Sequence, residues 1–196
     1  MSKADDTRQF IVEKTATIFN TKGYAGTSLS DMMDSTGLSK GCIYGNFQNK
    51  DEIALAAFDY NYNKVTEHIK SRILSTENSI ERLLVYPDTY RNYARYPYFS
   101  AGCPILNTAA EADDTHPALR QRASEALALW KKAVENQVKR GIARNEIKKD
   151  ADPEEIAVIM IAMIEGAFMQ AKLTGKTTTL KIAMTWLEKM ITDLRK

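Results

Sequence analysis

The sequence predicts an all-α protein of about nine helices, and two observations support this prediction. Nearly every segment of the 196 residues repeats its apolar side chains with the period of a helix, and no segment shows the alternation expected of a strand. Helix-start signals and breaks at Gly or Pro separate these periodic segments. A hydrophobic content of 44% can fill a core without disulfides, and two cysteines are too few for a disulfide framework.

The N-terminal part of the chain contains signals for three helices. The first is expected over residues 5–22, with apolar side chains on one face. Ser28 and Asp31 have the spacing of a capping box that opens the second helix. Gly37 supplies the positive φ that ends this helix, and Ser39 is the N-cap of the third. Two short helices joined by a glycine turn are the outline of a helix-turn-helix, whose second helix enters the major groove of DNA.

The remaining helices are longer. The run from Asp152 to Glu155 combines an N-cap, a proline at the first helical position and acidic residues in the first turn. Pro87 interrupts a helical pattern and is expected to kink that helix or to split off its first turn. The expected helices cover residues 50–74, 79–96, a short segment within 101–112, 117–143, 153–174 and 178–194.

The chemistry of the third helix suits a nucleic-acid interface. No Asp or Glu occurs from Ser35 to Lys50, whereas Lys40 and Lys50 are basic and the segment is rich in hydroxyl and amide side chains. Such groups bond phosphate oxygens. Because the formal net charge of the whole chain is only +2, any basic surface must be local. An ordinary helical hairpin on the protein surface is the alternative that these features alone leave open.

Residues 7–55 resemble the DNA-binding domain of the tetracycline-repressor (TetR/AcrR) family, in order and without gaps. Gly45 and Asn46 depart from the commonest pattern, in which an aromatic or His pair precedes the Phe. Gly45 lowers the helix propensity there by roughly 1 kcal/mol, and the departure concerns only the phosphate contacts made from these two positions. The matching pieces are Thr7-Arg8, Ala16 and Phe19, Gly23-Tyr24, Thr27-Ser28, Gly37 to Gly41, Ile43-Tyr44, Phe47 and Asn49 to Glu52.

This resemblance implies a fold and a function. The fold is all-α, with an N-terminal three-helix head and a helical body. Residues 1–50 would form the helix-turn-helix DNA-binding domain, and residues 51–196 the effector-binding and dimerisation domain. The helix over 50–74 would link the two. The implied function is that of a ligand-responsive, homodimeric transcriptional repressor, which a small apolar or aromatic effector releases from an inverted-repeat operator.

The resemblance also indicates which side chains contact DNA. The exposed N-terminal part of the recognition helix is expected to reach base edges. Ser39 has an alternative role as an N-cap alone, and Tyr44 as a core residue of the head. The residues expected at base edges are Ser39, Lys40, Gly41 and Cys42, and those expected at phosphates are Arg8, Thr27, Ser28, Tyr44, Asn46 and Lys50.

The last two helices, over about 153–174 and 178–195, are predicted to form the dimer interface. The first of them is apolar over more than one face, which requires partners on several sides. Two helices from each chain would then pair into a four-helix interface, as the family resemblance also implies. A buried central helix of a monomer is the alternative.

The body is expected to hold a mostly apolar effector pocket, since ligand cavities are lined by apolar and aromatic groups with a few polar tips. Plain core packing is the alternative for each candidate. A second hypothesis is thiol sensing, because Cys103 precedes Pro104 at a helix start and Cys42 lies on the recognition helix. The candidate pocket residues are Tyr86, Tyr90, Tyr93, Phe99, Cys103, Trp130, Met163 and Phe168.

Several classes of chemistry have no support in the sequence. His68 and His116 are the two histidines, no Cys or His cluster has metal spacing, and neither a phosphate loop nor a nucleophile elbow occurs. We therefore expect no enzyme activity, no metal and no cofactor. The apolar run 156–164 is far shorter than the roughly 20 residues of a membrane helix. With no secretion signal visible, a cytoplasmic protein without a membrane partner is expected. A helical protein that does not bind DNA is the remaining alternative.

Overall fold

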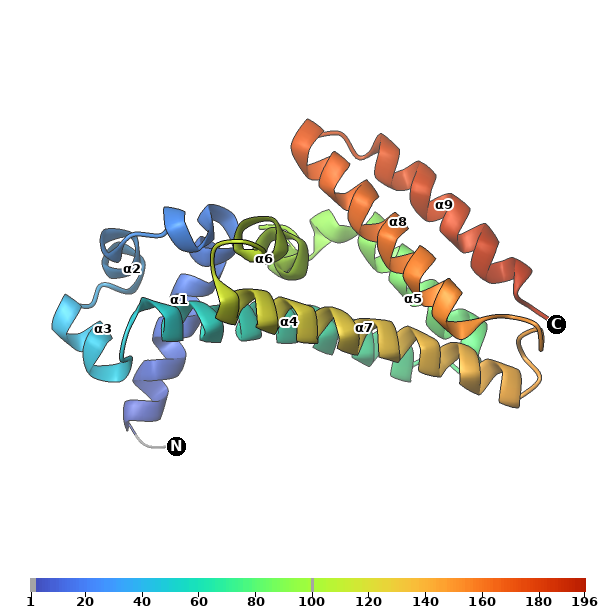
Figure 1. Cartoon of the computed structure of the whole chain (residues 1–196), viewed down its shortest axis with the longest axis horizontal. Helices are drawn as coiled ribbons and strands as arrows, with labels where there is room; N and C mark the ends of the chain where they lie inside the picture. Colours follow the sequence, from blue (N-terminus) through green and yellow to red (C-terminus); the bar gives the residue numbers. More distant parts are fainter. Residues whose placement is uncertain (1–2, 100) are drawn as a thin grey trace. The chain divides into compact units, whose positions relative to one another are not determined.

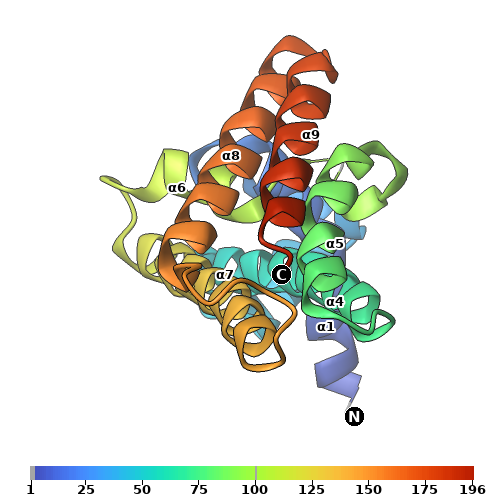
Figure 2. The same cartoon turned by 90° about the vertical axis from the view of Figure 1, so that its right-hand side faces the viewer.

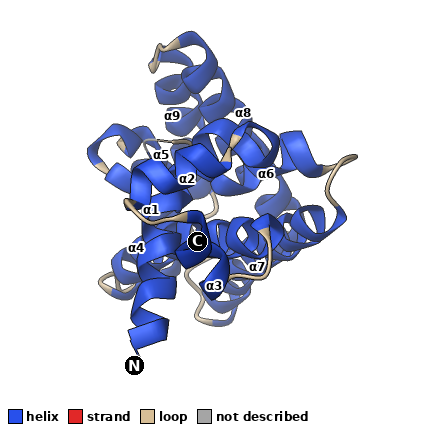
Figure 3. Cartoon of the chain, turned by 90° about the vertical axis from the view of Figure 1, so that its left-hand side faces the viewer, coloured by secondary structure: helices blue, strands red, loops and turns tan. Residues whose placement is uncertain are grey.

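The computed structural model describes residues 3–99 and 101–196 of the chain (Figure 1). Nine α-helices and two 3₁₀ turns occupy these residues, and Figure 3 shows helices and connecting loops only, which confirms the predicted all-α fold. In chain order the elements are α1 (Lys3–Gly26), α2 (Leu29–Thr36), α3 (Lys40–Asn46), α4 (Lys50–Leu74), α5 (Ser79–Arg91), η1 (Tyr93–Arg95), η2 (Pro97–Phe99), α6 (Pro104–Ala112), α7 (Pro117–Ala143), α8 (Pro153–Thr174) and α9 (Thr178–Asp193).

Two predicted boundaries are wrong, and backbone geometry explains both. Helix α1 continues to Gly26, but Gly23 has a non-helical φ of 73° and ψ of 179°, so the regular helix is broken there. Helix α5 ends at Arg91 instead of residue 96, and Pro87 lies buried inside it without splitting it. The amide of the Asn92 side chain donates to the Asp88 carbonyl over 2.9 Å, which closes the last turn before the 3₁₀ turns begin.

Contacts between Cα atoms divide the chain into two compact units. Unit 1 contains Met1–Val65 and Ala101–Glu125, and unit 2 contains Thr66–Ser100 and Ala126–Lys196. Residues 101–125 belong with the N-terminal residues because α6 packs against α1. This grouping describes packing only, and the functional boundary that we predict at residue 50 stays a prediction.

Unit 1 has its own apolar core. The fully buried side chains come from α1 to α4 and include Ile11, Met32, Ile43 and Ile53, while Phe47 is 2% exposed. Helices α2 and α3 have only eight and seven residues, and such short helices are not stable alone in water. Packing of Met32 and Ile43 into this core therefore determines where the two short helices lie.

Unit 2 contains α5, α8 and α9, and Figure 2 shows α8 and α9 running side by side in opposite directions. Within the described residues, α8 alone is long and apolar enough to cross a membrane by length and composition. The sequence analysis considered only the uninterrupted apolar run 156–164 and so did not identify the full length of this helix. A buried core helix of a soluble protein can have the same length and composition. Helix α8 packs against α5 and α9 and buries eight of its residues, among them Met160, Ile164 and Phe168.

The loop after α7 is fastened to the rest of unit 2. Within this loop Ile147 is fully buried, and the Glu146 carboxylate accepts the backbone N–H of Ser79 over 2.7 Å. Gly141 lies where this loop crosses α7. A Cβ atom at Gly141 would lie 2.5 Å from Ile147 Cδ1 and 2.9 Å from Ser79 Cβ, distances that real side chains do not adopt.

We predict that Gly141→Ala lowers the free energy of unfolding by about 1–3 kcal/mol, because the added methyl group overpacks the loop. Chemical denaturation measures this. Ile147→Val removes the Cδ1 atom that the methyl group meets first, so the cost of Gly141→Ala should be smaller in that background. An equal cost in both backgrounds would contradict the proposed collision.

Candidate nucleic-acid interface

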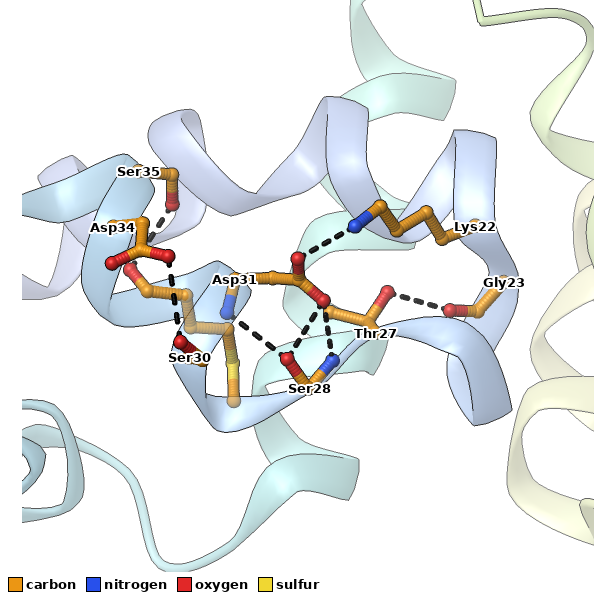
Figure 4. Close-up of polar contacts among 9 residues, drawn as sticks. Lys22, Gly23, Thr27, Ser28, Ser30, Asp31, Asp34 and Ser35 are labelled. Carbon is orange, nitrogen blue, oxygen red and sulfur yellow. Dashed lines mark hydrogen bonds and ion pairs between the residues drawn. The ribbon is translucent and has the colours of Figure 1, made fainter.

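Helix α2 begins with the capping box that its sequence predicts (Figure 4). The Ser28 hydroxyl accepts the Asp31 N–H over 3.1 Å, and the Asp31 carboxylate accepts the Ser28 N–H over 2.8 Å. Lys22 Nζ lies 2.6 Å from Asp31 Oδ1. The Lys22 ammonium, followed by the hydrogen bonds from Ser28, holds the pKa of Asp31 well below its usual range. The Asp31 carboxylate is thus ionised and is paired with donors inside unit 1.

The turn between α2 and α3 also has the predicted geometry. Gly37 has a φ of 69°, a left-handed conformation that glycine adopts without strain, and its N–H donates to the Met33 carbonyl over 2.8 Å. The Thr36 hydroxyl donates to the Met32 carbonyl and accepts the Leu38 N–H. These bonds satisfy the end of α2 and set the direction in which α3 starts.

Helix α3 separates a buried face from a solvent face. Ile43 and Phe47 are buried, whereas Ser39, Lys40 and Gly41 are exposed. The Ser39 hydroxyl accepts the Cys42 N–H over 3.3 Å, so the predicted N-cap forms at the same residue that we expect near base edges.

Two glycines leave part of the outer surface of α3 without side chains. A Cβ atom added at Gly41 or at Gly45 would meet nothing within 4 Å. The two glycines are one helical turn apart, so both lie on the same face of the helix. Cys42 and Tyr44 are half-buried between them. A backbone without side chains can approach another molecule closely, a property of Gly45 that the sequence pattern alone did not reveal.

Lys50 is positioned by an aromatic ring that the sequence analysis did not select. Its ammonium lies 4.5 Å from the centroid of the Tyr24 ring, and the Tyr24 hydroxyl donates to the Asp51 carboxylate. This hydrogen bond, followed by burial, raises the pKa of Tyr24 to about 12, so the hydroxyl stays a donor. The sequence analysis identified the Gly23-Tyr24 pair as a family match. It did not predict the contact of Tyr24 with α4, because that contact joins residues 27 positions apart.

Arg8 and Thr27 make internal contacts. The Arg8 guanidinium donates to the Asn46 carbonyl and to Glu52 over 2.6 Å each, and it lies over the Phe47 ring at 4.0 Å. Thr27 is fully buried, and its hydroxyl donates to the Gly23 carbonyl over 2.6 Å. The Thr27 side chain therefore cannot reach a phosphate, which corrects that expectation. Arg8 remains about 40% exposed and keeps its place among the proposed contacts.

In unit 2, most of the predicted effector residues form one aromatic cluster. Tyr90 lies at its centre, with ring centroids 5.2 Å from Phe99, 5.8 Å from Trp130 and 5.6 Å from Phe168. Tyr93 contacts Phe168, and Tyr86 stacks on Trp130. We call these six residues the aromatic cluster.

The other two predicted effector residues, Cys103 and Met163, are not part of the aromatic cluster. Cys103 is buried at the start of α6 in unit 1, and Met163 is half-buried on α8. Cys42 is half-buried, and within the described residues no disulfide joins it to Cys103.

Three buried polar atoms that the sequence did not predict lie in the aromatic cluster or close to it. Trp130 Nε1, Tyr98 Oη and His68 Nε2 are buried and have no hydrogen-bond partner among the described residues. Burial, followed by the Arg72 charge, lowers the pKa of His68, and burial raises the pKa of Tyr98 to about 12. Both side chains are therefore neutral near pH 7. Within residues 3–99 and 101–196, no group of three or more His, Cys, Asp or Glu side chains could hold a metal ion.

Comparison with known proteins decides the family. A family model described as "Bacterial regulatory proteins, tetR family" matches residues 11–57, and one described as "Tetracyclin repressor-like, C-terminal domain" matches residues 79–187. The chain belongs to the tetracycline-repressor family. Its function is accordingly that of a helix-turn-helix transcriptional regulator, which removes the alternative of a helical protein that does not bind DNA.

Solved structures and curated relatives agree with this TetR-family assignment. A TetR-family transcriptional regulator from Cytophaga hutchinsonii is 44% identical, with a TM-score of 0.94 over 100% of this chain and 98% of that one. A TetR transcriptional regulator from Chloroflexus aurantiacus is 41% identical, with a TM-score of 0.93 over 100% and 98%. The transcriptional repressor NemR of Escherichia coli is 24% identical over 95% of this chain and 94% of its own. These relatives are named as regulators, and they do not favour thiol sensing over the main hypothesis.

Proposed function

We propose that this TetR-family chain is a homodimeric repressor, which leaves an inverted-repeat operator when a small aromatic effector binds. The observation that carries the proposal is the geometry of α3, whose N-terminal residues Ser39 to Gly41 are exposed while Ile43 is buried. A recognition helix reads base edges with its N-terminal residues. The repressor name of the Escherichia coli relative supports repression, and binding to a bacterial operator implies a cytoplasmic location.

The proposed DNA contacts are residues that lie exposed or half-buried on α3 and next to it. Lys40 and Ser39 are placed for base edges, with Gly41 and Cys42 behind them on the same short helix. Phosphate contacts come from side chains around the rim of α3. These are Ser28, Tyr44, Asn46 and Lys50, together with the exposed part of Arg8.

We predict that Lys40→Ala weakens binding to a duplex that the wild-type protein selects from a random library. If Lys40 contacts a phosphate, the slope of log affinity against log salt should fall in magnitude by about 1. If it contacts a base, the sequence preference at one position should relax instead. Lys132→Ala on α7 is the control, because this lysine is exposed and lies in unit 2. Unchanged affinity, slope and preference for Lys40→Ala would contradict the assignment of α3.

We infer the dimer interface from apolar side chains that one protomer leaves exposed on α8 and α9. Leu173 is 82% exposed, Trp186 61% and Ile182 57%. Met169 and Leu173 are four residues apart on α8, and Ile182 and Trp186 are four apart on α9, so each pair lies on one face of its helix. Large apolar side chains gathered on one surface mark an interaction site. A second copy supplies the same surface, and a two-fold axis would place two α3 helices in successive major grooves.

We predict that the double substitution Ile182→Lys and Trp186→Lys converts the dimer to a monomer of about 22 kDa. Burying four like charges at a two-fold interface should prevent association. Light scattering after gel filtration measures the mass. Leu74→Lys is the matched control, because Leu74 is 69% exposed but lies at the end of α4. A wild-type monomer at micromolar concentration would contradict the interface.

We place the effector at the aromatic cluster of unit 2. Its rings offer stacking surfaces, and the buried Trp130 Nε1 is a donor without a hydrogen-bond partner among the residues that the structure describes. Buried polar atoms in native proteins are rarely unsatisfied, so such an atom needs an explanation. A flat aromatic compound with a hydrogen-bond acceptor matches both features. His68 and Tyr98, which are neutral, favour an uncharged effector.

We predict that such an effector quenches the fluorescence of Trp130 in the Trp186→Phe variant, where Trp130 is the remaining tryptophan. The same compound should release the selected duplex and stabilise the fold by about 2.7 kcal/mol at a concentration of 100 Kd. A screen of neutral phenols and quinones by thermal shift finds candidates. Tyr90→Ala should abolish the quenching. Saturable quenching that persists in Tyr90→Ala would place the effector elsewhere.

A further inference from the structure

Two backbone N–H groups at the end of α1 are capped by a side chain from another helix. The break at Gly23 interrupts the hydrogen-bond ladder of α1 just before Tyr24 and Ala25. The Glu111 carboxylate of α6 accepts the N–H of Tyr24 over 2.6 Å and that of Ala25 over 2.7 Å, one with each oxygen. Hydrogen bonds to an ionised carboxylate are among the stronger ones in proteins. Glu111 therefore does for the broken helix what an N-cap residue does for an ordinary one.

Glycine at position 23 is what allows the carboxylate to come so close. A Cβ atom at Gly23 would lie 2.7 Å from the carboxyl carbon of Glu111 and would collide with its oxygens. The φ of 73° is also one that other residues rarely adopt. The break in α1 and the position of Glu111 thus depend on each other.

A second contact fixes the register of α6 against α1. The Asn107 amide donates to the Asn20 carbonyl over 2.9 Å, and the Asn20 amide donates to the Gly102 carbonyl over 3.1 Å. Asn20 is 8% exposed, so these bonds are shielded from water. Asn107 and Glu111 are one turn apart on α6, and their partners Asn20 and Tyr24 lie on either side of the break at Gly23. Polar contacts from two successive turns of α6 therefore fix both sides of the break against this helix.

The residue that Glu111 caps leads directly to the proposed phosphate contacts. The Tyr24 ring lies under the Lys50 ammonium at 4.5 Å, and its hydroxyl bonds Asp51 at the start of α4. His116, at the turn before α7, meets the edge of the same ring at 4.5 Å and comes within 3.7 Å of Asp51. A change in the backbone at Tyr24 would therefore move the surface on which Lys50 rests.

This junction is too tight to hold an effector. The cleft beside Glu111, lined also by Phe19, Phe58 and Leu119, has a cavity volume of about 30 Å³. Ligand pockets are at least roughly ten times larger. The contacts around Glu111 therefore act on geometry within unit 1 and not on a bound small molecule.

We propose that Glu111 is a positioning residue for operator binding. Its carboxylate fixes the backbone at the end of α1 and thereby the position of the Tyr24 ring, which contacts the Lys50 ammonium. The inference rests on the proposed function, since it assumes that Lys50 and its neighbours contact operator phosphates. Glu111 itself touches no DNA in this proposal.

The test compares Glu111→Gln with Asp114→Asn. Each variant removes one negative charge, but Asp114 is exposed in the loop after α6, outside the contacts between α6 and α1 described above. Charge alone would make both variants bind DNA equally or more tightly. The proposal predicts the opposite sign for Glu111→Gln, a loss of roughly tenfold in affinity for the selected duplex. Affinity for a scrambled duplex should fall as well, because the contacts that Glu111 positions are made to phosphates, whereas Asp114→Asn should match or exceed the wild-type protein.

A second measurement separates positioning from folding. Circular dichroism and a thermal melt establish that Glu111→Gln is folded at the assay temperature, and hydrogen exchange of the Tyr24 and Ala25 amides should be faster than in the wild type. Equal operator affinity for Glu111→Gln and Asp114→Asn would overturn the inference, whatever the exchange rates. Should the wild-type protein select no duplex, the proposed function fails and the inference fails with it.

Discussion

The recognition surface depends on one constraint, which is that α2 and α3 are too short to be stable alone. Seven residues with two glycines form a poor helix by propensity, so α3 exists because Ile43 and Phe47 are buried and because Ser39 caps its first turn. The position of α3 is consequently determined by the packing of its buried face. Anything that moves the core beneath it, including the end of α1, also moves the residues that we propose contact DNA.

The sequence predicted the local part of this arrangement well. The capping box at Ser28, the left-handed Gly37 and the N-cap at Ser39 each involve residues at most four positions apart, and residue type is enough to identify them. The contacts of Arg8 with Glu52 and of Glu111 with Tyr24 join residues 44 and 87 positions apart. No spacing rule relates such residues, and the folded chain alone brings them together. Thr27 was expected at a phosphate but is buried, because packing in the folded unit, and not residue type, decides which side chains reach solvent.

In unit 2 the sequence selected aromatic residues as candidates for an effector pocket, which stays a prediction, but it did not indicate which polar atoms their packing leaves unsatisfied. Six of the eight candidates form the aromatic cluster around Tyr90. The unpartnered Trp130 Nε1 and His68 Nε2 follow from packing between distant helices and have no sequence signal. The end of α5 was misplaced for a related reason. The tyrosines after Arg91 continue a helical pattern, but the Asn92 cap and Pro97 divert the backbone into 3₁₀ turns.

The electrostatics of unit 1 explain how a chain with a net charge of only +2 can present a surface suited to DNA. Three of the carboxylates that flank α3 in the sequence accept hydrogen bonds from donors within unit 1. Asp31 accepts from Lys22 and Ser28, Glu52 accepts from Arg8 and the Gln48 N–H, and Asp51 accepts from Tyr24. The Gln48 and Arg8 bonds lower the pKa of Glu52, just as the bonds to Asp31 lower the pKa of that residue, so both stay ionised. Their negative charge is directed at internal donors, while Lys40 remains exposed on the face of α3, and local arrangement rather than total charge produces the binding surface.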